Sequence, residues 1–81
     1  MIVHMTTGAI TFEEGGRQAK ISVEALMRVN GNQTDFDIFE SSLTGWLPPH
    51  ESDVFTKADH DRIVRSICDE LTARGITYTI E

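Results

Sequence analysis

Five side chains in the second half of the chain could do metal or acid-base chemistry: His50, Glu51, Asp53, His60 and Asp61. Neutral imidazole and carboxylate groups are both accepted ligands of Zn²⁺. The usual pair of histidines four residues apart on one helix face is missing, and adjacent pairs such as His60-Asp61 rarely converge on one ion. We therefore interpret these residues as a solvated loop and a first helical turn, and expect no metal and no cofactor.

The thiol and hydroxyl groups do not form a nucleophile motif. Cys68 is the single cysteine, has no cationic cluster near it in sequence, and is interpreted as a small core residue. Ser41 and Ser42 stand outside any known nucleophile motif, and no glycine-rich phosphate loop is present. The sequence therefore predicts that the chain is not an enzyme.

The element that must position most of these groups is a helix in the C-terminal third of the chain. Thr56 is the predicted N-cap and Gly75 the residue that ends the helix. Apolar residues recur between them at spacings of three and four: Ile63, Val64, Ile67, Cys68 and Leu71. Residues 76–81 then alternate as a final strand, with Ile76, Tyr78 and Ile80 on one face.

The N-terminal half predicts strands. Residues 2–5 form a short one, and residues 9–13 and 17–23 form a hairpin around Gly15-Gly16. Residues 24–29 are read as an irregular stretch that tucks Leu26 under the sheet, and residues 30–32 as a turn. Residues 35–40 alternate again, with Phe36 and Ile38 facing inward.

These elements predict an α+β fold in a single domain, residues 1–81. We expect a small antiparallel sheet of about four or five strands, with one helix from the C-terminal half packed on one face and followed by a final strand. Residues 41–54, which include Pro48-Pro49, are expected to form a long loop.

Charge is distributed unevenly along the chain. Thirteen acids and seven bases give a formal net charge of −6, which argues against binding to nucleic acid or to anionic membranes. Residues 35–61 hold seven of the acids and one base, Lys57, so the whole net charge lies in this segment. The chain has neither a secretory signal nor an apolar run of the ~20 residues that cross a bilayer, so we expect a cytoplasmic protein.

Two further residues carry alternative interpretations. Trp46 either covers the edge of the core and pins its loop, or joins an exposed binding patch as an apolar anchor. His60, within the apolar stripe, is interpreted as a partly buried ring that hydrogen-bonds nearby backbone, with a pH-sensitive contact as the alternative.

The order of these features resembles the immunity protein 74 family of bacterial polymorphic toxin systems, over nearly the whole chain. The residues that carry the resemblance are the glycine-turned hairpin with Ile21 to Leu26 after it, Phe36 and Ile38, Trp46 with Pro48 and Pro49, Ile63 and Ile67, and Gly75. The resemblance implies a non-catalytic protein that binds and neutralises a cognate toxin, often a nuclease.

On this basis the partner is expected to be a toxin with a basic surface. The expected contact residues are Asp35, Asp37, Glu40, Glu51 and Asp53, with Trp46 as the apolar anchor. The alternative is a small homo-oligomeric adaptor or interaction domain that pairs through an open sheet edge or through Phe39. A small metal-dependent enzyme built on His50, Glu51 and His60 is the third possibility.

Overall fold

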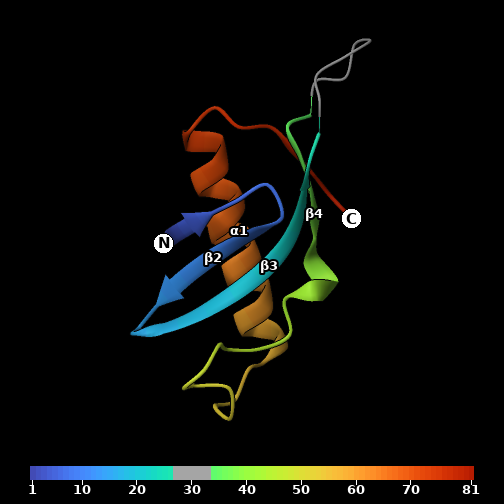
Figure 1. The fold of residues 1–81 in the computed structure, drawn as a ribbon. Helices are drawn as coiled ribbons and strands as arrows, with labels where there is room; N and C mark the ends of the chain where they lie inside the picture. Colours follow the sequence, from blue (N-terminus) through green and yellow to red (C-terminus); the bar gives the residue numbers. More distant parts are fainter. Residues whose placement is uncertain (27–33) are drawn as a thin grey trace.

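A five-stranded sheet with one long helix makes up the fold (Figure 1). The computed structural model describes residues 1–26 and 34–81. The elements are β1 (Ile2–Met5), β2 (Ala9–Glu14), β3 (Arg17–Ala25), β4 (Phe36–Phe39), the 3₁₀ helix η1 (Glu40–Ser42), α1 (Lys57–Ala73) and β5 (Tyr78–Ile80). The strands lie in the order β1-β2-β3-β4-β5. The α+β class, the single helix and the final strand are confirmed.

The β2–β3 hairpin forms as the sequence predicts. Gly15 and Gly16 have φ values of 59° and 79°, and two consecutive positive φ angles give the tight turn whose twist matches that of paired strands. Ile10 pairs with Ile21 and Phe12 with Ala19, so the apolar residues of both strands share one face.

The last pair of strands is parallel, which corrects the expectation of an antiparallel sheet. β5 lies beside β4 with Ile38 opposite Ile80, and all other neighbouring strands are antiparallel. Parallel neighbours need a crossover connection, and the chain makes it through the loop and α1 between β4 and β5. The helix is thereby held against one face of the sheet.

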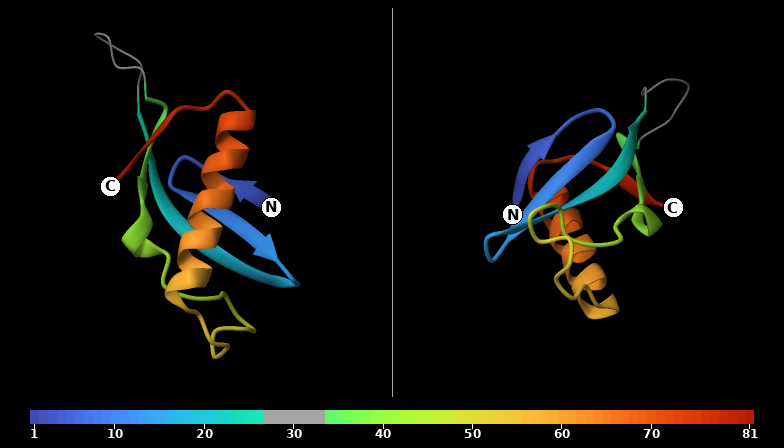
Figure 2. Two further views of the ribbon diagram at one scale, coloured as in Figure 1. Left: turned by 180° about the vertical axis from the view of Figure 1, so that it is seen from behind. Right: turned by 60° about the horizontal axis from the view of Figure 1, so that its bottom comes forward.

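The core lies between α1 and that face (Figure 2). Six large side chains are exposed by 1% or less: Ile10, Ile21, Ile38, Ile63, Ile67 and Leu71. The helical stripe is confirmed, with Val64 and Cys68 half-buried beside it. Ile76, just before β5, and Tyr78 within it are half-buried, whereas Ile80 at the sheet edge is 38% exposed, so the face that these three residues share is not buried at Ile80.

Several strand boundaries differ from the expectation: β4 covers Phe36–Phe39 rather than residues 35–40, and β5 covers Tyr78–Ile80 rather than residues 76–81. Glu24 and Ala25 continue β3 instead of starting an irregular stretch, because they pair with Asp37 and Phe36 of β4. Leu26 is half-buried and lies outside the core cluster. The predicted turn at residues 30–32 falls outside the described residues.

Both ends of α1 are defined by the residues that the sequence indicates. The Thr56 hydroxyl accepts the backbone N–H of Asp59 at 3.1 Å, and the Asp59 carboxylate accepts the backbone N–H of Thr56 at 2.9 Å. This reciprocal capping box satisfies two N–H groups that a helix start leaves without partners. At the other end Gly75 has φ 73°, the left-handed conformation that ends many helices.

We expect Thr56→Ala to lower the free energy of unfolding by about 1 kcal/mol, because it removes the cap acceptor. Thr56→Ser keeps the hydroxyl and should stay close to wild type. Urea denaturation of the three proteins measures the difference, and equal stability of both variants would contradict the role of the cap.

Candidate interaction surface

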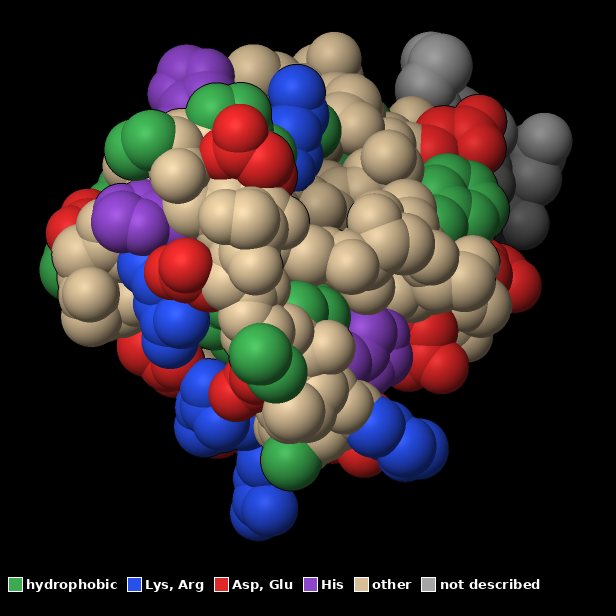
Figure 3. All heavy atoms as spheres, turned by 90° about the horizontal axis from the view of Figure 1, so that it is seen from below, with side chains coloured by type: hydrophobic (Ala, Val, Ile, Leu, Met, Phe, Trp, Pro, Cys, Tyr) green, Lys and Arg blue, Asp and Glu red, His purple; other side chains and the backbone are tan. Residues whose placement is uncertain are grey.

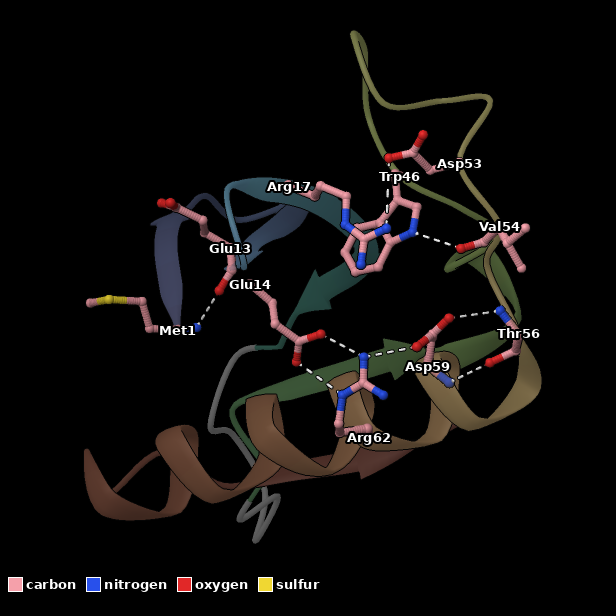
Figure 4. Close-up of polar contacts among 10 residues, drawn as sticks. All are labelled: Met1, Glu13, Glu14, Arg17, Trp46, Asp53, Val54, Thr56, Asp59 and Arg62. Atoms are coloured by element: carbon pink, nitrogen blue, oxygen red, sulfur yellow. Dashed lines mark hydrogen bonds and ion pairs between the residues drawn. The ribbon is translucent and has the colours of Figure 1, made fainter.

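Trp46 fixes the loop that carries Glu51 and Asp53 (Figure 4). Its indole is 4% exposed, its Nε1 donates to the Val54 carbonyl at 3.1 Å, and its ring meets Phe55 edge to face at 5.3 Å between centroids. Its backbone forms a bridge with Ala19 of β3. The loop is therefore attached to the sheet at one end and to the start of α1 at the other.

The Trp46 ring is also in contact with the Arg17 guanidinium group. The Arg17 guanidinium carbon lies 4.1 Å from the ring centroid, within the range of a cation–π interaction. Arg17 also lies 3.6 Å from the Asp53 carboxylate, which is 3.4 Å from His50 Nδ1. Asp53 is thus partly neutralised within the molecule.

This placement corrects the expectation that Trp46 is an exposed apolar anchor. A side chain with 4% of its surface accessible offers no area to a partner. The other interpretation describes its position: the indole covers the edge of the core and pins the loop. The exposed apolar side chain of this loop is Val54, at 77%.

A second charged cluster ties α1 to the hairpin (Figure 4). Arg62 donates through Nε to Glu14 of β2 at 3.0 Å and through Nη2 to Asp59 at 2.9 Å. The hydrogen bond from Arg62 lowers the pKa of Glu14, and the backbone N–H of Thr56, followed by Arg62, lowers the pKa of Asp59. Glu14 and Asp59 therefore support the fold, since both bind Arg62.

Three of the expected contact acids lie along β4 and η1. Asp35 accepts the Thr77 backbone N–H at 3.0 Å, so its carboxylate joins the start of β4 to the approach to β5. Asp37 stands directly between Glu24 of β3 and Thr79 of β5. The carboxylates of Asp37 and Glu40 have no hydrogen bond or ion pair within the described ranges.

Two of the five expected acids lie far apart in the fold. Asp53 lies beside Arg17, the first residue of β3, whereas Asp37 is opposite Glu24, near its last residue. At about 3.3 Å per residue these positions on β3 are roughly 20 Å apart. Figure 3 shows acidic side chains at several separate places on the end of the molecule, with Lys and Arg among them. Asp37 and Asp53 therefore do not share one surface patch, although the sequence places both among the expected contact residues.

In the structure, His50 and His60 have different partners and do not meet around one site. Among residues 1–26 and 34–81, no group of three or more His, Cys, Asp and Glu side chains could hold a metal ion. His50 faces Asp53, whereas His60 faces Glu40 and Asp61. Burial raises the pKa of the Cys68 thiol, which disfavours the reactive thiolate.

His60 joins α1 to the end of β4. Its Nε2 lies 2.9 Å from the Glu40 carbonyl oxygen and its Nδ1 2.9 Å from the Asp61 carboxylate, which also binds Lys57 at 2.7 Å. The predicted backbone hydrogen bond is confirmed. Both partners of the ring are acceptors only, so the imidazolium, which donates from both nitrogens, satisfies both contacts.

The protonated form is accordingly favoured in the folded protein. The hydrogen bond to Asp61, followed by that to the Glu40 carbonyl, raises the pKa of His60 above its ordinary value of 6.5. The sequence signal for this contact was a histidine inside an apolar stripe, but its partner in η1, the Glu40 carbonyl, could not be predicted from the sequence.

The fold and its surface are those of a small α+β protein. In the part described, its titratable side chains cap the helix, link neighbouring elements or are exposed as surface charge. The family model described as immunity protein 74 matches residues 2–81, and the chain belongs to this family. Immunity proteins are non-catalytic toxin inhibitors, so the resemblance and the non-enzymatic class are confirmed. No curated protein and no solved structure matches the chain. No helix within the described ranges is long and apolar enough to cross a membrane.

We expect Trp46→Phe to destabilise the protein by about 1–3 kcal/mol, because it leaves the Val54 carbonyl without its donor and removes buried volume. Limited proteolysis should also cut residues 48–54 faster. Val54→Ala, which trims an exposed side chain and keeps the carbonyl, should change stability by less than about 0.5 kcal/mol. If residues 48–54 of Trp46→Phe were cut no faster than those of wild type, Trp46 would not be what holds the loop in place.

The hydrogen bonds of His60 to Glu40 and Asp61 should make a pH-dependent contribution to stability. Because the pKa is higher in the folded than in the unfolded protein, the stabilisation is fully present below about pH 6.5 and is lost as the pH rises through the folded-state pKa. The stability advantage of wild type over His60→Gln should therefore be larger near pH 5.5 than near pH 9.

An NMR titration of the imidazole provides the direct measurement. Asp61→Asn should lower the pKa of His60, whereas Asp69→Asn, which removes one acid elsewhere on the same helix, should leave it unchanged. A His60 pKa at or below 6.5 in the wild-type protein would contradict the proposed stabilisation of the imidazolium by these two hydrogen bonds.

Proposed function

We propose that this chain neutralises a nuclease-type toxin, and that its excess negative charge guides the toxin onto it. Membership of the immunity protein 74 family supports the inhibitory role. The nuclease class is supported by the charge: a nuclease collects basic residues around its phosphate-binding cleft, and an inhibitor of net charge −6 is complementary to such a surface.

The acids available to a partner differ in their surroundings. Asp37, Glu40 and Glu51 have no ion pair in the described part of the chain, whereas Asp53 shares Arg17 and His50, and Asp35 is bonded to Thr77. All five are proposed to contribute to the field that steers the toxin, and the three without such contacts can bind its cations at the smallest loss of internal interactions.

The loop is suited to docking because it is already held in place. Trp46, Phe55 and the Ala19 bridge attach it before any partner arrives. A surface that is ordered in advance loses less conformational entropy on binding than a slack one. Trp46 would then contribute to binding through the position of Glu51 and Asp53, without touching the toxin.

The test uses the toxin domain encoded beside this gene. We expect it to degrade nucleic acid, an equimolar amount of this protein to stop the degradation, and the association rate to fall about tenfold or more between ~0.05 and ~0.5 M salt. Glu51→Gln, which removes one charge without breaking an ion pair, should slow association.

Each part of the proposal has its own contrary result. A toxin domain with another activity would refute the nuclease class, and an association rate indifferent to ionic strength would refute steering. Failure of the wild-type protein to bind the adjacent toxin at all would refute the pairing itself.

A further inference from the structure

One face of the sheet is left without a covering helix by the described residues. Figures 1 and 2 show α1 on a single side of the sheet in both views. Because successive side chains of a strand point to opposite faces, the neighbours of buried Val23 and Ile38 point away from α1. Glu24, Asp37 and Phe39 occupy the open face where β3 meets β4.

The two carboxylates on this face oppose each other. Glu24 and Asp37 are directly paired across the antiparallel β3–β4 ladder, and like charges in that position destabilise a sheet. Neither has a hydrogen bond or ion pair among the described residues, and the next residue along the row, Thr79 of β5, carries no charge. Within the described part of the chain, the two adjacent acids therefore repel each other, and a cation bound between them would relieve this repulsion.

An aromatic side chain stands next to this pair. Phe39 is opposite Ser22 on the open face, is half-buried, and does not belong to the hydrophobic core or to the residues packed against it. Aromatic side chains, Phe included, are enriched in protein interfaces relative to the rest of the surface. Its aromatic surface adds an apolar contact next to the two carboxylates.

We propose that this open face, formed by Glu24, Asp37 and Phe39, is where the toxin docks, and that an arginine or lysine of the toxin binds between the two carboxylates. The inference rests on the proposed function and specifies its contact surface. The loop that carries Glu51 and Asp53, roughly 20 Å away along β3, then lies at the rim of this contact, where its acids act mainly on the association rate.

Charge favours a basic partner over a second copy of this chain. The equivalent acids of two copies would repel where this part of the face met itself, whereas a basic cleft neutralises both at once. The single base placed on this face by β3 is Lys20, which pairs with Thr11 of β2, away from β4.

The experiment measures dissociation of the adjacent toxin domain from Asp37→Asn and Glu24→Gln. We expect each to raise the dissociation rate about tenfold, because charges in direct contact control dissociation, whereas distant ones act mainly on association. Asp69→Asn, which removes one charge from α1, is the matched control and should dissociate like wild type. Each open-face variant should also raise the midpoint of thermal unfolding by about 1–4 °C, since it relieves the repulsion.

Dissociation rates within twofold of wild type for both variants would overturn the docking face, while inhibition by the wild-type protein would leave the proposed function intact. Absence of wild-type binding would overturn both. A wild-type dimer in sedimentation that Asp37→Asn abolishes would show that a second copy occupies the face, and would also overturn the proposal.

Discussion

The arrangement of this protein depends on one helix being packed against one face of its sheet. Ile63, Ile67 and Leu71 reach a surface made by β2, β3 and β4, and the parallel placement of β5 beside β4 requires the chain to cross that same face. Residues 1–26 and 34–81 form no second α-helix that could cover the other face. The alternation of each strand therefore decides what that open face presents, and at β3–β4 it presents acids and an aromatic ring.

The carboxylates of this molecule are of two kinds: some form ion pairs and hydrogen bonds that support the fold, and others are left available to a partner. Asp59 and Glu14 converge on Arg62 and hold the helix to its cap and to the hairpin, whereas Asp61 binds Lys57 and His60 within the first turns of α1. Exposed pairs of this kind contribute little to stability one by one. Their effect is to fix geometry, and they take acids out of the set that a partner can use.

Sequence patterns predicted the local structure well because local rules govern it. The capping residues of α1, its apolar stripe and the Gly15-Gly16 turn are all decided by neighbours within a few positions. The parallel β4–β5 pair was missed, because strand order follows from how distant segments pack. For Trp46 the sequence left two interpretations, a cover for the core edge or an exposed anchor, and only the fold decides between them, because its partners Arg17 and Ala19 are far away in sequence.

The candidate surface illustrates the same limit at the level of single residues. The alternation of Gln18, Lys20 and Ser22 extends by one more step to Glu24, and this signal could have placed Glu24 on the outer face of β3. What no alternation can show is that Asp37 comes to lie opposite it, because that depends on the register of β3 against β4. Counting acids along the chain grouped Asp37 with Asp53, which lies near the other end of β3, and left out the acid that faces Asp37 directly. Electrostatic interaction follows distance in the fold, so a run of charge in the sequence does not by itself show which acids lie together on the surface.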